Sequence, residues 1–335
     1  MTTYSEETAT TGTRWRGPHA PVDESQVQQV VARLRGSITE VFLGKPDVVD
    51  RCLTALLGQG HLLIEDVPGV GKTLLARAIA KSLDCKFTRI QFTPDLLPSD
   101  ILGSSIYNGQ TGEFRFRPGP LFANVVLADE INRTSPRTQS ALLEAMNSAE
   151  VSIDGVTYPL PPPFLVLATQ NPFEFEGTYA LPESQLDRFM LRVTIGYPPR
   201  DAERRLLVDH REGEPIDHLK SVVSADEVVA LQHFVRHIRV DDAVNDYLLD
   251  VIHATREHEE LQVGVSTRGA LMLYRSAQAL AVLRGRTFTV PDDVKELAIP
   301  VLAHRVVGKS FVQGRSLSAA EEVLHSILER VPPPD

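Results

Sequence analysis

One segment constrains the fold of this chain more than any other: residues 61–74, where an apolar run, a glycine-containing loop and the start of a helix follow one another. The loop ends in Gly71-Lys72-Thr73. Glycine permits backbone angles that turn successive N–H groups towards one point, and the N-terminus of a helix adds partial positive charge there. The segment therefore predicts a phosphate-binding loop that follows a strand of a parallel α/β sheet.

Each part of this loop has an expected task. Lys72 is expected to reach the β- and γ-phosphates of a nucleotide, and Thr73 to ligate Mg²⁺. The loop departs from the common G-x4-G-K-T pattern at Asp66, where that pattern has glycine, and an incidental glycine-rich turn is the alternative reading. The phosphate-handling end is intact, so we expect ATP and Mg²⁺ to bind here. The expected nucleotide-binding residues are Pro68, Gly69, Val70, Gly71, Lys72, Thr73 and Leu74.

Polar residues follow two further apolar runs. Residues 124–128 are followed by Asp129 and Glu130. We expect Asp129 to hold Mg²⁺ and Glu130 to polarise the water that attacks the γ-phosphate; a solvated acid pair is the alternative. Residues 164–168 lead to Asn171, which on its own would indicate only an Asn-Pro turn. Because α/β sites form at the carboxyl ends of strands, we expect Asn171 to lie beside the other two side chains.

The order of these elements predicts the fold class. Short apolar runs alternate with helical patterns up to about residue 197, which is typical of a parallel sheet with helices on both faces. After Pro198-Pro199-Arg200, apolar residues recur at three- and four-residue spacing instead. We therefore predict a flexible tail over residues 1–23, an αβα sandwich over residues 24–199 and an all-helical domain over residues 200–335.

Composition excludes several other classes of protein. Two cysteines, Cys52 and Cys85, cannot form a disulfide framework or a structural zinc site. His233 and His237 have the i, i+4 spacing of a metal pair, but no H-E-x-x-H pattern accompanies them, so we expect an ordinary helix face. No apolar run approaches the roughly 20 residues that cross a bilayer, so we expect a cytoplasmic protein. A net charge of −10 disfavours a nucleic-acid partner without excluding a local basic channel.

Taken together, these motifs resemble the AAA+ ATPases and, within them, the MoxR family. The resemblance extends from about residue 27 to residue 332. It implies an αβα core with a helical lid, working as a ring, usually a hexamer, with nucleotide between protomers. It also implies chaperone-like maturation of client proteins, often with a von Willebrand A domain adaptor. The segments that carry the resemblance are Asp66-Val67-Pro68-Gly69-Val70-Gly71-Lys72-Thr73, Ala128-Asp129-Glu130-Ile131-Asn132-Arg133, Ala168-Thr169-Gln170-Asn171-Pro172, Gly177-Thr178-Tyr179, Leu181-Pro182-Glu183 and Leu186-Asp187-Arg188-Phe189.

The resemblance implies further site residues. Arg188 is similar to the arginine finger that enters the neighbouring protomer's site, and Arg133 is a second candidate for that role. Arg268 is similar to the sensor-2 arginine that lets the lid detect the γ-phosphate. An ordinary surface or salt-bridging arginine is the alternative for each. The segment from Val41 to Gly44 resembles the one that packs against adenine.

Two inserted segments fit the same group. Residues 106–116 resemble an insert that interrupts a core helix. Residues 151–158 hold two β-prone triplets joined by Asp154-Gly155, which predicts a hairpin that faces either a pore or partner, or solvent. Three other functions stay open: a nucleic-acid motor of the same superfamily, a nucleotide-gated scaffold with little turnover, and a chelatase subunit that powers metal insertion into a tetrapyrrole.

Overall fold

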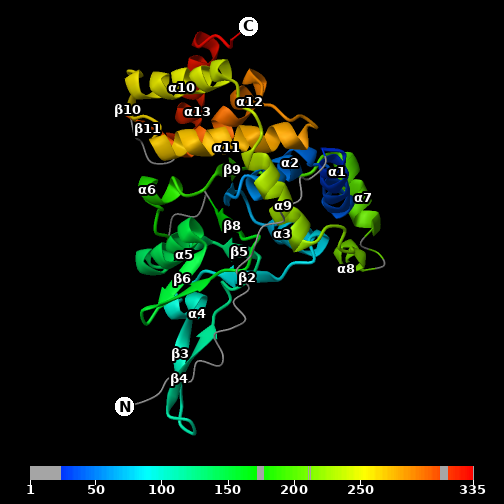
Figure 1. The fold of residues 1–335 in the computed structure, drawn as a ribbon, viewed down its shortest axis with the longest axis vertical. Helices are drawn as coiled ribbons and strands as arrows, with labels where there is room; N and C mark the ends of the chain where they lie inside the picture. Colours follow the sequence, from blue (N-terminus) through cyan, green and yellow to red (C-terminus); the bar gives the residue numbers. More distant parts are fainter. Residues whose placement is uncertain (1–23, 172–176, 210, 212, 310–315, 335) are drawn as a thin grey trace.

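The structure is a computed structural model that describes residues 24–171, 177–209, 211, 213–309 and 316–334. The tail predicted at residues 1–23 lies outside this part of the chain. Its centre is a five-stranded parallel sheet in the order β2-β5-β8-β1-β9 (Figure 1). The strands are β1 (Leu62–Glu65), β2 (Phe87–Gln91), β5 (Val125–Asp129), β8 (Leu165–Gln170) and β9 (Leu191–Val193). The parallel sheet predicted from the apolar runs is thereby confirmed.

The inner strands are buried on both faces, which explains their unbroken apolar sequences. Successive residues alternate between two cores: Leu62 and Ile64 belong to one, and Leu63 belongs to the other. Helices α1 (Glu24–Val41), α2 (Pro46–Leu57) and α3 (Lys72–Ser82) supply the first core. Helices α4 (Pro98–Leu102) and α5 (Pro136–Ser148) supply the second. The order β5-β8-β1 brings the three motif-bearing strand ends side by side at one edge of the sheet.

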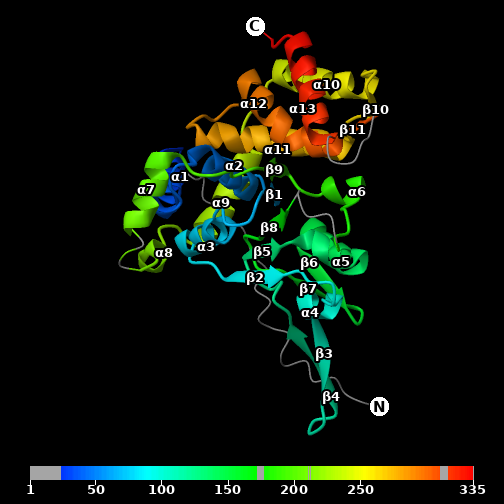
Figure 2. The same ribbon diagram turned by 180° about the vertical axis from the view of Figure 1, so that it is seen from behind.

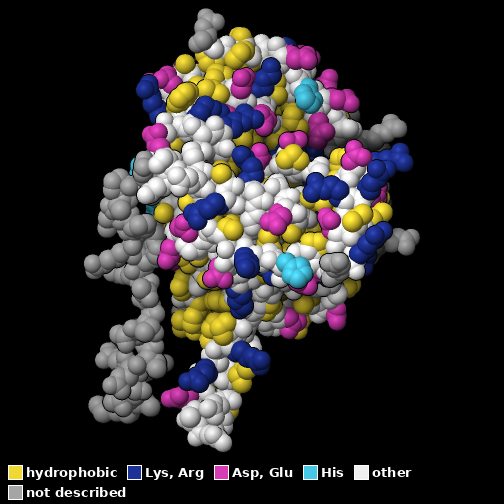
Figure 3. Space-filling model, turned by 90° about the vertical axis from the view of Figure 1, so that its right-hand side faces the viewer, with side chains coloured by type: hydrophobic (Ala, Val, Ile, Leu, Met, Phe, Trp, Pro, Cys, Tyr) yellow, Lys and Arg dark blue, Asp and Glu magenta, His cyan; other side chains and the backbone are white. Residues whose placement is uncertain are grey.

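Two antiparallel hairpins lie beside the core. β3 (Gly103–Asn108) and β4 (Glu113–Pro118) form the longer one, which projects from the body in both views (Figures 1 and 2). Arg115 and Arg117 are exposed on it. Figure 3 shows basic side chains along the projection. The rings of Phe116 and Tyr158 stack at 4.2 Å and join it to the second hairpin.

The second hairpin consists of β6 (Glu150–Ile153) and β7 (Val156–Pro159), so the hairpin predicted at residues 151–158 is present. Its turn residues Asp154 and Gly155 have φ angles of 52° and 80°. Both values are positive, as a type I′ turn requires, which explains the Asp-Gly pair.

The C-terminal part of the chain is mainly helical. Ser224 and Glu227 form a capping box at the start of α9 (Ala225–Arg236), in which each side chain accepts a hydrogen bond from the other residue's main-chain N–H. One difference from the all-helical prediction is a short antiparallel pair, β10 (Leu261–Val263) with β11 (Val307–Gly308). The helices of this part are α7 (Arg200–Asp209), α8 (Pro215–His218), α9 (Ala225–Arg236), α10 (Asp242–Glu257), α11 (Thr267–Leu283), α12 (Pro291–Leu302), η4 (Ala303–Arg305) and α13 (Ser316–Arg330). The short helices α6 (Glu183–Leu186) and η2 (Ile131–Arg133) lie earlier in the chain.

These C-terminal helices pack onto the N-terminal ones. Both α9 and α11 contact α2, and their apolar residues join the first core (Figure 1). The boundary near residue 200 therefore remains a prediction, since one apolar core continues across it. Within the part of the chain described here, none of the helices has the length and apolarity to cross a membrane.

Candidate nucleotide site

A cavity of about 370 Å³ lies at the carboxyl edge of the sheet. Two larger cavities occur elsewhere, one among the C-terminal helices and one between core and lid, but neither contains a residue of the motifs. The structure therefore brings together the phosphate-binding, acidic and amide residues that the sequence placed far apart. The residues that line the 370 Å³ cavity are Pro68, Gly69, Gly71, Lys72, Thr73, Leu74, Arg89, Asp129, Glu130 and Asn171.

The loop between β1 and α3 has the geometry of an anion cradle. Gly69 and Gly71 have φ angles of 86° and 94°, in the region that favours glycine. A Cβ on Gly69 would meet no described atom within 4 Å, so this face of the loop is open. Gly71 begins α3, and a Cβ there would lie 3.3 Å from the ring of Phe42. Lys72 Nζ donates to the main-chain oxygen of Asp66 at 2.6 Å, which holds the ammonium group across the loop.

Asp66, the departure from the common motif, anchors the loop. Its carboxylate is buried and accepts hydrogen bonds from the main-chain N–H groups of Val67 (2.8 Å), Ile195 (2.7 Å) and Gly196 (2.6 Å). These contacts tie the start of the loop to the segment that follows β9. A glycine at this position could make none of them, so the substitution replaces conformational freedom with a fixed anchor.

Thr169 contacts both residues of the acidic pair. Its Oγ1 donates to Asp129 Oδ1 at 2.6 Å and accepts from the main-chain N–H of Glu130 at 2.9 Å. Glu130 has φ 58° and ψ 50°, a left-handed conformation that is uncommon for a residue with a side chain. Such strain is found where surrounding contacts over-determine the backbone, as the threonine does here.

Three basic or amide groups contact these carboxylates. Arg89 Nε donates to Asp129 Oδ2 at 3.0 Å. Gln91 Nε2 donates to Glu130 Oε2 at 2.8 Å, and Arg133 Nε lies 3.1 Å from the same oxygen. Arg133, the second candidate for a trans-acting arginine, thus contacts the acidic pair of its own chain.

Sequence reasoning missed Arg89, Gln91 and Thr169. Arg89 and Gln91 alternate along β2, which pairs with β5 so that Gln91 lies opposite Asp129. The available signal was a pair of polar residues at alternate positions near the carboxyl end of a strand. Using that signal would have required knowing that β2 lies next to β5 in the sheet.

The other predicted site residues do not line this cavity. Val41 is a buried residue at the end of α1. Gly44 has a φ of 80°, and a Cβ added to it would lie 2.7 Å from the side chain of Ala202. Arg268 is exposed in the first turn of α11. Arg188 is partly exposed, and its buried Nε has no hydrogen-bond partner among the described residues.

The donor set fits one hard cation held jointly with a phosphate. Thr73 and Asp129 both line the cavity and offer the oxygen ligands that Mg²⁺ prefers. No group of three or more His, Cys, Asp and Glu side chains in the described ranges could hold a metal alone. The spacing of His233 and His237 reflects a local contact, in which Nδ1 of His237 lies 2.8 Å from the main-chain oxygen of His233.

Comparison with known proteins agrees with this geometry. Residues 61–191 match the ATPase family associated with various cellular activities (AAA), and residues 253–327 match the AAA lid domain. The chain is 48% identical over 297 residues to YeaC, an uncharacterized protein of Bacillus subtilis, covering 89% of this chain and 92% of that protein. It is 43% identical over 279 residues to Chaperone MoxR1 of Mycobacterium tuberculosis, covering 81% and 74%.

A solved structure extends the likeness to the whole fold. The crystal structure of a candidate ATPase from Cytophaga hutchinsonii superimposes with a TM-score of 0.84 at 35% sequence identity, covering 93% of this chain and 97% of that one. The C-terminal helical region thus corresponds to the lid of these ATPases. The strand order, the phosphate loop and these relatives together lead to one assignment: this chain belongs to the MoxR family of AAA ATPases.

Proposed function

We propose that this ATPase remodels, activates or matures partner proteins and works as a ring in which each nucleotide site is completed by the neighbouring protomer. One observation carries the shared-site proposal. Arg89 is the one arginine among the described residues that line the cavity, and its guanidinium is bound to Asp129. Phosphoryl transfer is often assisted by an arginine against the γ-phosphate, in addition to the loop lysine and Mg²⁺, so we infer that a second chain supplies that arginine.

Arg188 is the residue suited to that task. It lies outside its own cavity, it is partly exposed, and its Nε has no partner within the described part of the chain. A partly exposed arginine can stabilise charge in an adjacent site. AAA ATPases as a family also suggest an oligomer.

The residues of the cavity divide the reaction between them. Lys72 and the main-chain N–H groups of the loop bind the β- and γ-phosphates. Glu130 holds the attacking water and accepts its proton, and Asn171 orients that water with its amide. Thr73 and Asp129 would hold Mg²⁺, which neutralises phosphate charge when bound.

The remodelling role is supported by similarity to a relative named as a chaperone, 43% identical to this chain. By the same analogy we propose a protein client, a von Willebrand A domain adaptor and a cytoplasmic location. A nucleic-acid motor is less favoured, because the chain carries a net charge of −10. The chelatase and scaffold alternatives differ from this proposal in what stimulates turnover.

The shared site is tested by mixing two inactive variants. Glu130→Gln removes the water-activating carboxylate, and Arg188→Ala removes the proposed trans cation; each alone should lower turnover at least about 100-fold. In mixed rings an Arg188→Ala chain keeps its own Glu130 and receives Arg188 from a Glu130→Gln neighbour. We therefore expect the mixture to regain part of the wild-type rate, and turnover per chain to rise with protein concentration.

The control is Arg239→Ala, because Arg239 is 77% exposed and pairs with Asp241 on the surface. This variant should hydrolyse ATP at the wild-type rate. An Arg188→Ala variant with full activity, and a rate per chain that does not change with concentration, would contradict the shared site while leaving the ATPase intact.

The remodelling role is tested separately. A von Willebrand A domain protein from the same organism should raise the ATPase rate, and its client should change protease sensitivity only with ATP and wild-type protein. Single- and double-stranded DNA serve as competing additions. Stimulation by DNA that weakens with salt would favour the motor instead.

A further inference from the structure

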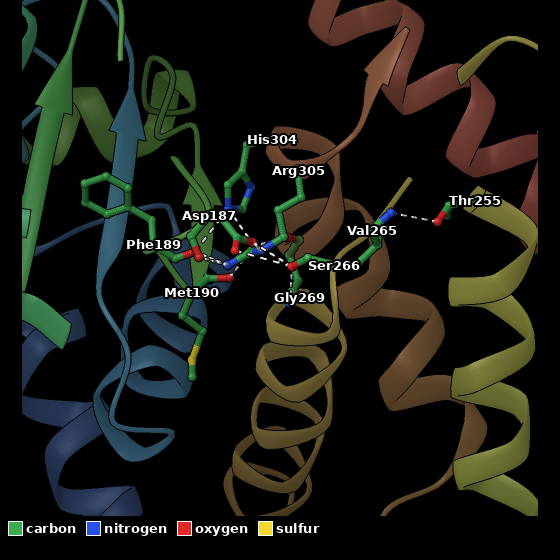
Figure 4. A network of polar contacts seen from close by, with 10 residues as sticks. Asp187, Phe189, Met190, Thr255, Val265, Ser266, Gly269, His304 and Arg305 are labelled. Atoms are coloured by element: carbon green, nitrogen blue, oxygen red, sulfur yellow. Dashed lines mark hydrogen bonds and ion pairs between the residues drawn. The ribbon is translucent and has the colours of Figure 1, made fainter. Parts of the chain in front are cut away.

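Arg305 is a buried arginine at the contact between the lid and the core (Figure 4). It ends η4, and its side chain is 1% exposed. Its Nε donates to Asp187 Oδ1 at 2.9 Å, and its Nη2 donates to the main-chain oxygen of Asp187 at 3.2 Å. Further hydrogen bonds reach the main-chain oxygens of Phe189, Met190 and Val301. The guanidinium thus fixes the chain on both sides of Arg188.

Burying this charge is unfavourable in itself. Burial lowers the pKa of Arg305 to about 10, the facing Asp187 carboxylate opposes that shift, and nearby Arg268 adds to it. The side chain remains charged at neutral pH. Replacing both partners of a buried ion pair with apolar residues of similar volume is often neutral, so such a pair fixes geometry more than it adds stability.

Asp187 connects this arginine to a second part of the lid. Ser266 Oγ lies 3.3 Å from Asp187 Oδ2 and also caps α11, where it accepts from the N–H of Gly269 at 3.1 Å. Arg268 lies in that same first turn of α11. One carboxylate therefore contacts both lid segments and is directly followed in sequence by Arg188.

Gly269 shows how closely the parts fit. A Cβ added there would lie 2.9 Å from Cδ of Arg305 and 2.6 Å from Cγ1 of Val265. Distances below 3.0 Å do not occur for real Cβ atoms, so the first turn of α11 can approach Arg305 only with glycine at this position. This steric contact is independent of the hydrogen bonds and restrains the same side chain.

We propose that Asp187, Ser266 and Arg305 form a positioning junction, which we name the Arg305 junction, that fixes Arg188 and Arg268 relative to each other. The inference rests on the proposed function in the roles of these two arginines. Its consequence is that a lid movement sensed at the protomer's own nucleotide also moves the arginine offered to the next site. The three junction residues act through Arg188 and Arg268 and do not touch the nucleotide cavity.

The first test is kinetic. Asp187→Asn keeps the shape of the side chain and removes its charge, and Arg305→Lys keeps the charge and removes the fork of donors. We expect both variants to bind ATP within about threefold of wild type, since the phosphate loop is untouched. We expect kcat to fall at least tenfold and the dependence of rate on ATP concentration to lose its cooperativity.

A milder pair of variants avoids the loss of a buried ion pair. Gly269→Ala pushes on Arg305, and Gly36→Ala is its control, because a Cβ at Gly36 meets nothing within 4 Å. Gly36→Ala should behave as wild type, whereas Gly269→Ala should lower kcat without weakening ATP binding. Wild-type kcat and cooperativity in folded Asp187→Asn and Gly269→Ala would overturn the proposal.

The second test does not depend on the shared site. Hydrogen exchange of the segments around Arg188 and Arg268 should slow together when ATP binds to wild type, and should respond separately in Asp187→Asn. If Arg188→Ala is fully active but this joint response is lost in Asp187→Asn, the shared site fails and the junction stands. If Arg188→Ala is inactive and the joint response persists in Asp187→Asn, the junction fails alone.

Discussion

Two arginines join the lid to the core, and they do so in different ways. Arg305 projects from the lid and donates mainly to main-chain oxygens. Arg192 projects from β9 and bridges two carboxylates, Glu65 of β1 and Glu321 of α13, which we name the Arg192 bridge. Glu65 is 10% exposed and Glu321 37% exposed, so one half of the bridge is buried and the other reaches solvent.

The difference suggests a rigid contact at one place and an adjustable one at the other. The main-chain oxygens of residues 187, 189 and 190, which accept from Arg305, lie close together in the sequence and hold its guanidinium in one orientation. The Arg192 bridge instead lies beside a cavity of about 530 Å³ between core and lid, and its outer partner is a flexible side chain. The bridge also leads to the phosphates, because Glu65 directly precedes Asp66 and accepts from Gln170, the neighbour of Asn171.

The largest expected effect comes from removing the rigid contact. Arg305→Met should lower the free energy of unfolding by roughly 3–5 kcal/mol, because Asp187 and several carbonyl groups lose their buried donor. The shift of the chemical unfolding midpoint measures it, with Arg239→Ala as the exposed control. If Arg192→Met were equally destabilising, the contrast between the two contacts would be wrong.

The next effect separates stability from nucleotide binding. Arg192→Met should lower the free energy of unfolding by about 1–3 kcal/mol, since Glu65 keeps Gln170 as a donor but loses its counter-ion. It should also weaken ATP binding roughly threefold to tenfold, because Glu65 adjoins the anchor of the phosphate loop. Titration with a fluorescent ATP analogue measures the affinity.

A double variant is the control for this prediction. Glu65→Gln combined with Arg192→Met leaves no unpaired charge, so it should regain part of the lost stability. Unchanged ATP affinity in Arg192→Met would show that the bridge supports only the packing of the lid.

The sequence predicted elements and motifs better than contacts between them. The inner strands β1, β5 and β8 were predicted because a buried parallel strand is continuously apolar. Lys72, Thr73, Asp129 and Glu130 were predicted to lie together because they follow such strands in known patterns, and all four line one cavity. The roles suggested for Arg188 and Arg268 remain predictions.

The residues that were missed depend on partners distant in sequence. Thr169 contacts Asp129 across 40 positions, and Arg305 contacts Asp187 across 118. Residues 200–335 were predicted to be all-helical, which would make Arg305 one more basic residue on a helix. The chain instead tightens into η4 there, and the tertiary contact with Asp187 decides where the side chain lies.

The pH dependence of stability tests the surroundings of the Arg305 junction through His304, the residue next to Arg305 in the sequence. Burial, and then the charge of Arg305, hold the pKa of His304 well below 6.5, so His304 is neutral in the folded protein. The unfolded chain takes up this proton near pH 6.5, so the stability contributed by neutral His304 is present above that pH and declines as the pH falls below it. The melting temperature of wild type should therefore fall between pH 7.5 and 5.

His304→Gln should show a shallower fall over the same range. Buried His61, whose pKa burial lowers to about 4, acts with the same sign and remains in both proteins. The difference between wild type and variant thus isolates His304. If the melting temperatures of the two proteins fell in parallel with pH, the surroundings of Arg305 would not oppose protonation of His304.

The smallest expected effect lies at the exposed end of the Arg192 bridge. Glu321→Gln should change the free energy of unfolding by less than about 1 kcal/mol, because a carboxylate partly in solvent is well hydrated without its partner and Arg192 keeps Glu65. That small change should shrink further between 0.1 and 1 M salt, where screening weakens exposed pairs. Unfolding midpoints at the two salt concentrations measure it. If Glu321→Gln were as destabilising as Arg192→Met and insensitive to salt, the outer half of the bridge would be as rigid as the Arg305 junction, and the lid would be fixed to the core at both places.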